Sequence, residues 1–265
     1  MRSLYNTKGE HPLVQRFRNL GALSPDEITA LRVLANKPLR TIGARRDIIR
    51  EGEPPRGVQL IISGWACAYR MLADGRRQNL AFYLPGDLTD IHHDVLDEMD
   101  HSITALSEVQ YVELACNELD QLGSAYPGLL RALRLQSMIA TAVQREWMVG
   151  IGQRSAFERL SHLFCELFLR LEAVGLTDDM VCDMLATQPD LAEATGLTPI
   201  HVNRMLRDMR EAGLVELKNR RLSIRNFAAL QASGLFLPEY LRFKSPRSVL
   251  NSNDFDVIRA TTNGA

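Results

Sequence analysis

Polar residues suited to molecular recognition gather in one segment, QPDLAEATGLTPIHVNRMLR, which spans residues 188–207. His201, Asn203 and Arg204 can hydrogen-bond the edges of DNA bases, and an arginine can bind guanine in bidentate fashion. Arg207 is better suited to a phosphate group. This set of side chains predicts contact with double-stranded DNA.

The spacing of the segment predicts how these side chains are held. Pro189 lies in the first turn of one expected helix and Gly196 ends it, while Thr198 caps a second helix that begins at Pro199. Two helices joined by a three-residue turn form a helix-turn-helix, whose second helix enters the major groove. The inner positions are small or apolar, as the packing of the two helices requires: Leu191, Ala192, Leu197, Val202 and Met205. A helical hairpin with a solvated, charged face is the alternative interpretation.

A β-hairpin with a basic tip is expected directly afterwards. Residues 214–217 form its first strand, residues 218–221 its turn and residues 222–224 its second strand. Such a wing contacts the sugar-phosphate backbone, and residues 201–225 include seven Lys and Arg against three acids, an excess of +4. The residues expected to contact DNA, with Ile200 against a thymine methyl group, are Gln188, Thr198, Ile200, His201, Asn203, Arg204, Arg207, Lys218, Arg220 and Arg221.

The whole chain has no such excess of positive charge. Its 265 residues include 31 Lys and Arg and 32 Asp and Glu, and 46 % of them are hydrophobic. A net charge of −1 argues against a protein coated in positive charge, and the length and apolar content predict two folded domains. No stretch has the ~18–20 apolar residues of a membrane span, and the polar start lacks the apolar centre of a secretory signal. We therefore expect a cytoplasmic protein.

Short strands are expected before the long helices. A helix should start at Ser24, where Pro25 and Glu27 complete a capping pattern. From about residue 40 to 115, short runs of β-branched and aromatic residues alternate with Gly, Pro and Asp, which predicts a small antiparallel barrel or sandwich. The expected strands are residues 48–49, 59–63, 65–72, 79–84, 102–105 and 110–114.

A short helix over residues 117–122 precedes a long one from Pro127 to about Gly150, and a further helix follows over 156–174. Apolar residues cover more than one side of the long helix, so one side can pack on the barrel while another meets a second copy of the chain. The residues expected to face that copy are Leu135, Ile139, Ala142 and Val149. We expect a homodimer; a wholly intramolecular helix is the alternative. The expected units are a sensor domain (1–126), a dimerisation helix (127–152), a DNA-binding domain (153–243) and a flexible tail (244–265).

The order of barrel, long helix and winged helix resembles the cyclic-AMP receptor protein and fumarate-nitrate regulator (Crp/Fnr) family. The matching segments are residues 51–53, 60–64, 74–75 and 85–87, together with residues 188–207 and the wing. The resemblance implies an α+β fold with an N-terminal β-roll of the cyclic-nucleotide-binding type, a long dimerisation helix and a C-terminal winged helix-turn-helix. It also implies a transcription factor that dimerises, binds a two-fold-related DNA site and contacts RNA polymerase.

The effector pocket that the resemblance implies departs from the cyclic-nucleotide pattern. Family members that bind cyclic AMP have Gly-Glu-Leu followed by Arg-Ser or Arg-Thr, whereas this chain has Asp87 for the acid and His101, mostly neutral at pH 7, for the arginine. Residues 87–101 hold six acids and no Lys or Arg, which should repel a phosphate. We therefore do not expect cyclic AMP to bind. The pocket residues by this alignment are Gly86, Asp87, Leu88, His101, Ser102, Ala142 and Val143.

Other sensing chemistry finds little support. The family's iron-sulfur cluster uses clustered N-terminal cysteines, but no cysteine precedes Cys67, so that cluster is excluded. His92 and His93 could ligate a metal or haem, although an acidic, solvated loop is the simpler account. The four cysteines are best explained as small buried hydrophobes, with a thiol sensor at Cys67 or Cys116 left open.

These patterns and the family resemblance together predict a homodimeric transcription regulator that binds a palindromic operator and whose sensor domain is degenerate for cyclic AMP. A sensor of an effector or metal that acts mainly through protein contacts is the alternative. No catalytic motif is present, so we expect no enzyme.

Overall fold

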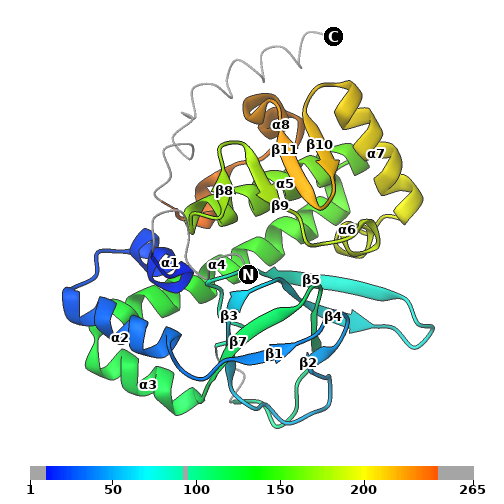
Figure 1. Cartoon of the computed structure of the whole chain (residues 1–265). Helices are drawn as coiled ribbons and strands as arrows, with labels where there is room; N and C mark the ends of the chain where they lie inside the picture. Colours follow the sequence, from blue (N-terminus) through cyan, green and yellow to red (C-terminus); the bar gives the residue numbers. More distant parts are fainter. Residues whose placement is uncertain (1–9, 92–94, 244–265) are drawn as a thin grey trace.

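The computed structural model describes residues 10–91 and 95–243 (Figure 1). Its N-terminal half is a β-roll of two antiparallel sheets, with strand orders β1-β7-β3 and β2-β6-β4-β5. The strands are β1 (Arg40–Ile42), β2 (Asp47–Ile49), β3 (Val58–Ser63), β4 (Ala66–Met71), β5 (Arg77–Tyr83), β6 (Ser102–Ala105) and β7 (Val109–Leu114). All six expected strands are confirmed to within two residues at each end, and β1 is an addition that the sequence pattern did not indicate.

Three short helices pack against the β-roll: α1 (Pro12–Leu20), α2 (Pro25–Ala35) and α3 (Cys116–Ala125). The expected capping box of α2 is confirmed, since Ser24 and Glu27 each accept a hydrogen bond from the other's backbone N–H. Helix α1 was not expected, because the start of the chain reads as polar. It nevertheless buries Leu13, Val14 and Phe17 between the β-roll and the later helices.

Two long helices connect the halves of the molecule, α4 (Pro127–Gln153) and α5 (Ala156–Ala173). In Figure 1, α4 runs between the β-roll and the C-terminal module. Ile139, Val143 and Trp147 of α4 are buried in one core with Trp65 and Phe82 of the β-roll. The expectation that Ile139 faces a second copy is therefore wrong, because its side chain is only 4 % exposed within the protomer.

The C-terminal module consists of β8 (Thr177–Asp178), β9 (Val181–Asp183), α6 (Gln188–Thr195), α7 (Pro199–Glu211), β10 (Val215–Lys218), β11 (Arg221–Ile224), α8 (Phe227–Ser233) and a final 3-10 turn, η2 (Pro238–Leu241). Its sheet has the order β10-β11-β9-β8. Phe236, Leu241 and Phe243 are buried, so the last described residues belong to the core. No helix of the described residues is long and apolar enough to cross a membrane.

The module docks directly on the β-roll through α6 and β5. Asp190 of α6 accepts two hydrogen bonds from Arg45, at 2.5 and 2.8 Å, and its backbone oxygen accepts one from Asn79 of β5 at 3.0 Å. Gln78 donates to the backbone oxygen of Glu193 at 2.6 Å. Because Asn79 and the Asp190 side chain are buried, the first helix of the helix-turn-helix is anchored to the β-roll of its own chain.

Candidate nucleic-acid interface and sensor cavity

The helix-turn-helix has the geometry that its spacing predicts. Gly196 ends α6 with a φ of +65°, a conformation that glycine adopts without strain, and the Thr198 side chain caps α7 by accepting from the His201 N–H at 3.3 Å. Val202 and Met205 are buried against α5 and α6. Helix α7 is thus fixed by one apolar face, and its opposite face is open.

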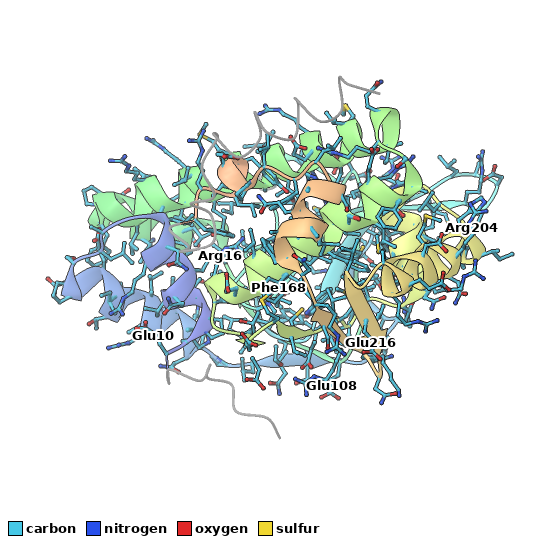
Figure 2. The ribbon with its side chains drawn as sticks, turned by 90° about the horizontal axis from the view of Figure 1, so that it is seen from above. Glu10, Arg16, Glu108, Phe168, Arg204 and Glu216 are labelled. Atoms are coloured by element: carbon cyan, nitrogen blue, oxygen red, sulfur yellow. The ribbon has the colours of Figure 1, made fainter. Side chains whose placement is uncertain are left out.

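The open face of α7 carries the side chains expected to read bases. His201, Asn203 and Arg204 are exposed, and Ile200 is 81 % exposed. Figure 2 shows Arg204 at the edge of the molecule, far from Arg16 and Phe168 near its middle. Asn203 donates to the Gln188 side chain at 3.3 Å, which ties the two helices together on this face. The arrangement has the shape and the donors that a major groove requires.

The wing, residues 215–224, is an antiparallel hairpin whose tip is Asn219 and Arg220, both with positive φ. Lys218 and Arg221 pair across the hairpin, and the side chains of Lys218, Arg220 and Arg221 are exposed. Among the described residues, none of these three cations forms an ion pair within 4 Å, and neither does Arg204. All four remain available to phosphates or bases.

A second functional candidate is a cavity of about 460 Å³ between the β-roll and α4, here called the sensor cavity. Asp87, Leu88, His101 and Val143 line it, as the alignment with the family predicted. Three other predicted residues are not in its lining: Gly86, Ser102 and Ala142. Ser102 is buried and accepts a hydrogen bond from the Glu51 N–H at 2.9 Å instead.

The position of Gly86 explains how α1 approaches the loop that follows β5. Gly86 has a φ of +89°, and a Cβ atom there would lie 2.9 Å from the backbone oxygen of Pro12. Only glycine therefore lets the start of α1 lie directly on this loop. On the α4 side, Val143 is in the cavity wall while its neighbour Ala142 is half-buried outside it, and Thr141 supplies a hydroxyl-bearing residue that the alignment did not foresee.

Asp87 is the centre of a buried charge cluster rather than a free acid. Its two carboxylate oxygens lie 2.6 Å from Arg16 of α1 and 2.7 Å from Arg170 of α5, and one of them also accepts from the Leu84 N–H at 2.8 Å. The first of the six acids that were expected to repel a phosphate is therefore compensated. Nearby arginines, 71 residues before and 83 residues after Asp87, supply the positive charge that the loop lacks.

The cluster continues into the C-terminal module through Glu166. Arg170 binds Glu166 at 3.0 Å and donates to the backbone oxygen of Phe82 at 2.7 Å. Glu166 accepts from the indole of Trp147 at 2.9 Å and from the Tyr240 hydroxyl at 3.2 Å, and burial raises the pKa of this carboxyl group. We call Arg16, Asp87, Glu166 and Arg170 the Asp87 cluster. Only the Glu166–Arg170 pair, four residues apart on α5, has a local sequence signal, because the members of the whole cluster come from α1, the loop after β5 and α5.

His101 is charged, contrary to the expectation from sequence. Burial alone would lower the pKa of its imidazole, but Asp90 at 2.9 Å and Asp100 at 2.7 Å raise that pKa to about 9. Tyr83 donates to the same Asp90 carboxylate at 3.3 Å. At pH 7 the imidazole is therefore a cation held between two acids.

The cysteines and the His92–His93 pair are the remaining candidates for sensing chemistry. Cys67, Cys165 and Cys182 are buried, as expected, and burial raises the pKa of the Cys67 thiol far above its ordinary value. A thiol held in its neutral form is a poor nucleophile. His92 and His93 lie outside the described residues, so a metal or haem there stays an untested alternative.

Two domain families match the chain. Residues 39–126 match the cyclic nucleotide-binding domain, and residues 158–233 match the Crp-like helix-turn-helix domain. The chain is 25 % identical over 213 residues to the nitrogen fixation regulation protein FixK of Azorhizobium caulinodans, covering 80 % of this chain and 85 % of that protein. It is 23 % identical over 198 residues to the transcriptional activator protein FnrL of Cereibacter sphaeroides, covering 73 % and 79 %.

The fold is also similar to that of a solved structure. The structure of FixK2 from Bradyrhizobium japonicum superposes with a TM-score of 0.66 at 22 % identity, covering 73 % of this chain and 95 % of that one. The two matched domains together span more than half of the chain and occur in the family's order. With its β-roll joined through α4 to a helix-turn-helix and wing, the chain is a DNA-binding transcription regulator of the Crp/Fnr family.

Proposed function

We propose that the protein regulates transcription as a homodimer that binds a palindromic operator. Each protomer would place α7 in the major groove of one half-site, with His201, Asn203 and Arg204 at base edges and the wing on the neighbouring backbone. The observation that carries this proposal is the exposed face of α7 beside four cations without ion-pair partners, Arg204, Lys218, Arg220 and Arg221. Such a regulator works at the chromosome, hence in the cytoplasm, and RNA polymerase is its expected protein partner.

The exposed side of α4 supports the homodimer. Met138, Ala142 and Val149 recur at intervals of four and seven residues, which places them on one face of the helix. Met138 is 68 % exposed and Val149 46 %, and Met148 beside them is 73 % exposed. A second copy of α4 would cover this apolar stripe. Ala142, Val149 and the half-buried Leu135 thus stay candidates for the interface, with Met138 in the place of Ile139.

The sensor domain is proposed to be degenerate for cyclic AMP. Asp87 stands where the family's ribose-binding acid would stand, but both of its oxygens already bind guanidinium groups. His101 stands for the phosphate-binding arginine, but Asp90 and Asp100 already neutralise its charge. Neither group is free to bind a cyclic nucleotide in the family's manner.

Binding to genomic DNA fragments tests the proposal most directly. The full chain, mixed with fragments and competitor DNA in ~150 mM salt, should retain a small specific set, and those fragments should share an inverted repeat. Cyclic AMP should leave both the set and the affinity unchanged. Retention of no fragment above the competitor would contradict the proposal and favour a sensor that acts through protein contacts.

Sedimentation equilibrium tests the dimer separately. Met138→Glu should convert the dimer to a monomer, because the substitution places a charge in the proposed interface. Val33→Glu is the matched control, since Val33 is 67 % exposed on α2, away from α4's apolar stripe, and should leave the dimer intact. A Met138→Glu variant that stays dimeric would rule out this face of α4.

A further inference from the structure

The helix-turn-helix is held on the β-roll by a residue with an unusual backbone conformation. Arg45, in the turn between β1 and β2, has a φ of +65°, which is strained for an arginine and which glycine adopts freely. Its N–H donates to the backbone oxygen of Ala105 at 2.7 Å, and this bond holds the turn in place. Its guanidinium group donates to both carboxylate oxygens of Asp190 and, at 3.2 Å, to the Thr187 hydroxyl. An arginine in this strained position indicates that its side chain is kept for the contact with α6.

The contact fixes the start of α6. Burial alone would raise the pKa of Asp190, but hydrogen bonds from Arg45 and Thr187 lower that pKa, so the carboxylate is charged. The same carboxylate caps α6, because it accepts from the Thr187 N–H at 2.7 Å. A bidentate pair between Arg45 and a carboxylate that is itself held fixes direction as well as distance.

Two donors from β5 hold the rest of the helix. Asn79, which is 1 % exposed, donates to the backbone oxygen of Asp190 at 3.0 Å, and Gln78 donates to the backbone oxygen of Glu193 at 2.6 Å. The Glu193 carbonyl is among the last four of α6, which a helix leaves without an intrahelical N–H partner. Arg45, Gln78 and Asn79 thus bind α6 near both of its ends, and we call these contacts the α6 clamp.

The clamp determines how the helix-turn-helix is oriented relative to α4. The C-terminal module is joined to α4 by a two-residue link, Arg154 and Ser155, between the end of α4 and the start of α5. A further attachment to the β-roll lies near the other end of α5, where Arg170 binds Asp87. Those contacts hold α5, whereas the clamp holds the helix-turn-helix itself. Because α6 and α7 share one apolar core, a fixed α6 also fixes α7.

We propose that Arg45, Gln78 and Asn79 are positioning residues that set the distance between the two α7 helices of a dimer, and with it the half-site spacing that the protein accepts. This inference rests on the proposed homodimer and its palindromic operator. The clamp fixes each α7 relative to the β-roll on which α4 packs, so the separation of the two recognition helices is built into the protomer. One added base pair moves a half-site by about 3.4 Å and turns it by about 34–36° around the DNA axis, and clamped helices cannot follow that change.

A series of operators that differ only in the number of central base pairs tests the clamp. The parental chain should bind one spacing best and lose at least about tenfold in affinity when one base pair is added or removed, because the DNA must deform to fit. Arg45→Gly combined with Gln78→Ala removes two donors, and the variant should fold, since the Arg45 side chain is 47 % exposed and glycine relieves the strained turn. In this double variant the loss should shrink to less than about threefold. A base substitution within a half-site should keep its parental effect, since α7 is unchanged.

Fluorescence anisotropy measures both responses, and Arg46→Ala is the matched control. Arg46 is the next residue of the same connection and is exposed, so its removal should preserve the spacing preference. A double variant that keeps the parental preference, or that loses affinity equally for every spacing, overturns the proposal. So does one that binds the preferred operator more tightly, because the clamp would then oppose DNA binding. If the double variant does not fold, Arg45→Lys carries the same test, since lysine keeps the charge but not the bidentate geometry.

Distances between the two α7 helices, measured without DNA, separate this inference from the proposed function. A spin label on a ketone-bearing residue introduced in place of Glu211, which is 68 % exposed at the end of α7, reports this distance in the dimer. The distance distribution should be narrow in the parental chain and broad in the double variant. Equal widths in the two chains refute the clamp alone. A parental chain that binds no inverted repeat refutes the proposed function and the spacing preference with it.

Discussion

Arginines serve opposite purposes in the two halves of this molecule. In the Asp87 cluster, Arg16 and Arg170 are 4 % and 6 % exposed, and each binds a carboxylate within 3 Å. On α7 and the wing, Arg204, Arg220 and Arg221 are exposed and form no ion pair with any described residue. The buried arginines join α1 and α5 to the loop after β5, and the exposed ones keep the charge that the proposed contact with a polyanion requires.

The contrast shows why charge counted along the chain is an incomplete guide. Residues 87–101 carry six acids and no Lys or Arg, which by itself predicts a repulsive field. In space, arginines from α1 and α5 neutralise the first of those acids, and the protonated His101 lies between two others. For residues 201–225 the count along the chain is a better guide. Their excess of +4 lies on a helix and a hairpin that are consecutive in sequence.

The largest effect is expected from breaking the buried cluster. Asp87→Asn should lower the free energy of unfolding by about 3–5 kcal/mol, because it leaves two buried guanidinium groups without their shared counter-charge. Asp74→Asn is the control, since Asp74 is 55 % exposed and its ion pair with Arg76 should contribute less than about 1 kcal/mol. Urea unfolding of both variants checks this. A loss below about 1 kcal/mol for Asp87→Asn would mean that the cluster does not hold the domains together.

The next effect concerns base recognition by the exposed arginines. Arg204→Ala should weaken binding to the operator by about 1–3 kcal/mol and relax selectivity at one base pair of each half-site. Arg210→Ala, further along α7, should preserve selectivity. Fluorescence anisotropy with the operator and its single-base variants measures both. An unchanged selectivity profile in Arg204→Ala would assign base reading to other residues of α7.

A smaller, sequence-independent effect is expected at the wing. Arg220→Gln combined with Arg221→Gln should weaken binding to all DNA sequences alike and reduce the slope of log affinity against log salt by about two. Arg76→Gln, in the turn between β4 and β5 and 76 % exposed, should leave the slope unchanged. If the double variant kept the parental slope, the wing would not contact phosphates.

The elements that were predicted well are those whose signals are local. Strand alternation identified six strands of the β-roll, and capping residues identified the start of α2 and of α7. The helix-turn-helix was predictable because Gly196, Thr198 and Pro199 act on their immediate neighbours. Its exposed face followed from helical periodicity alone.

The features that were missed depend on contacts between distant residues. In the sequence, Arg16 belongs to a polar N-terminal segment with no sign of its partner. The packing of α1 over Gly86 brings it to Asp87. From the sequence, the apolar Ile139 could lie either in a dimer interface or in the core. It lies in the core because Trp65 and Phe82 of the β-roll pack in the same cluster. The charge of His101 likewise depends on Asp90, eleven residues away, and not on its own sequence context alone.

His101 is intermediate between the buried arginines of the Asp87 cluster and the exposed arginines of α7 and the wing. It is partly buried and paired with acids in the lining of the sensor cavity. Its pKa of about 9 in the folded chain exceeds the ordinary value of 6.5, so the folded state binds this proton more tightly than the unfolded state. The stabilisation of the folded state by the protonated His101 is complete below pH 6.5 and is lost as the pH rises through about 9. Because the site is partly solvated, we expect a contribution of no more than about 1 kcal/mol. Melting temperatures measured from pH 6.5 to 9.5 should fall more steeply for the parental chain than for His101→Gln, and parallel curves would show that this imidazole is not a cation in the folded protein.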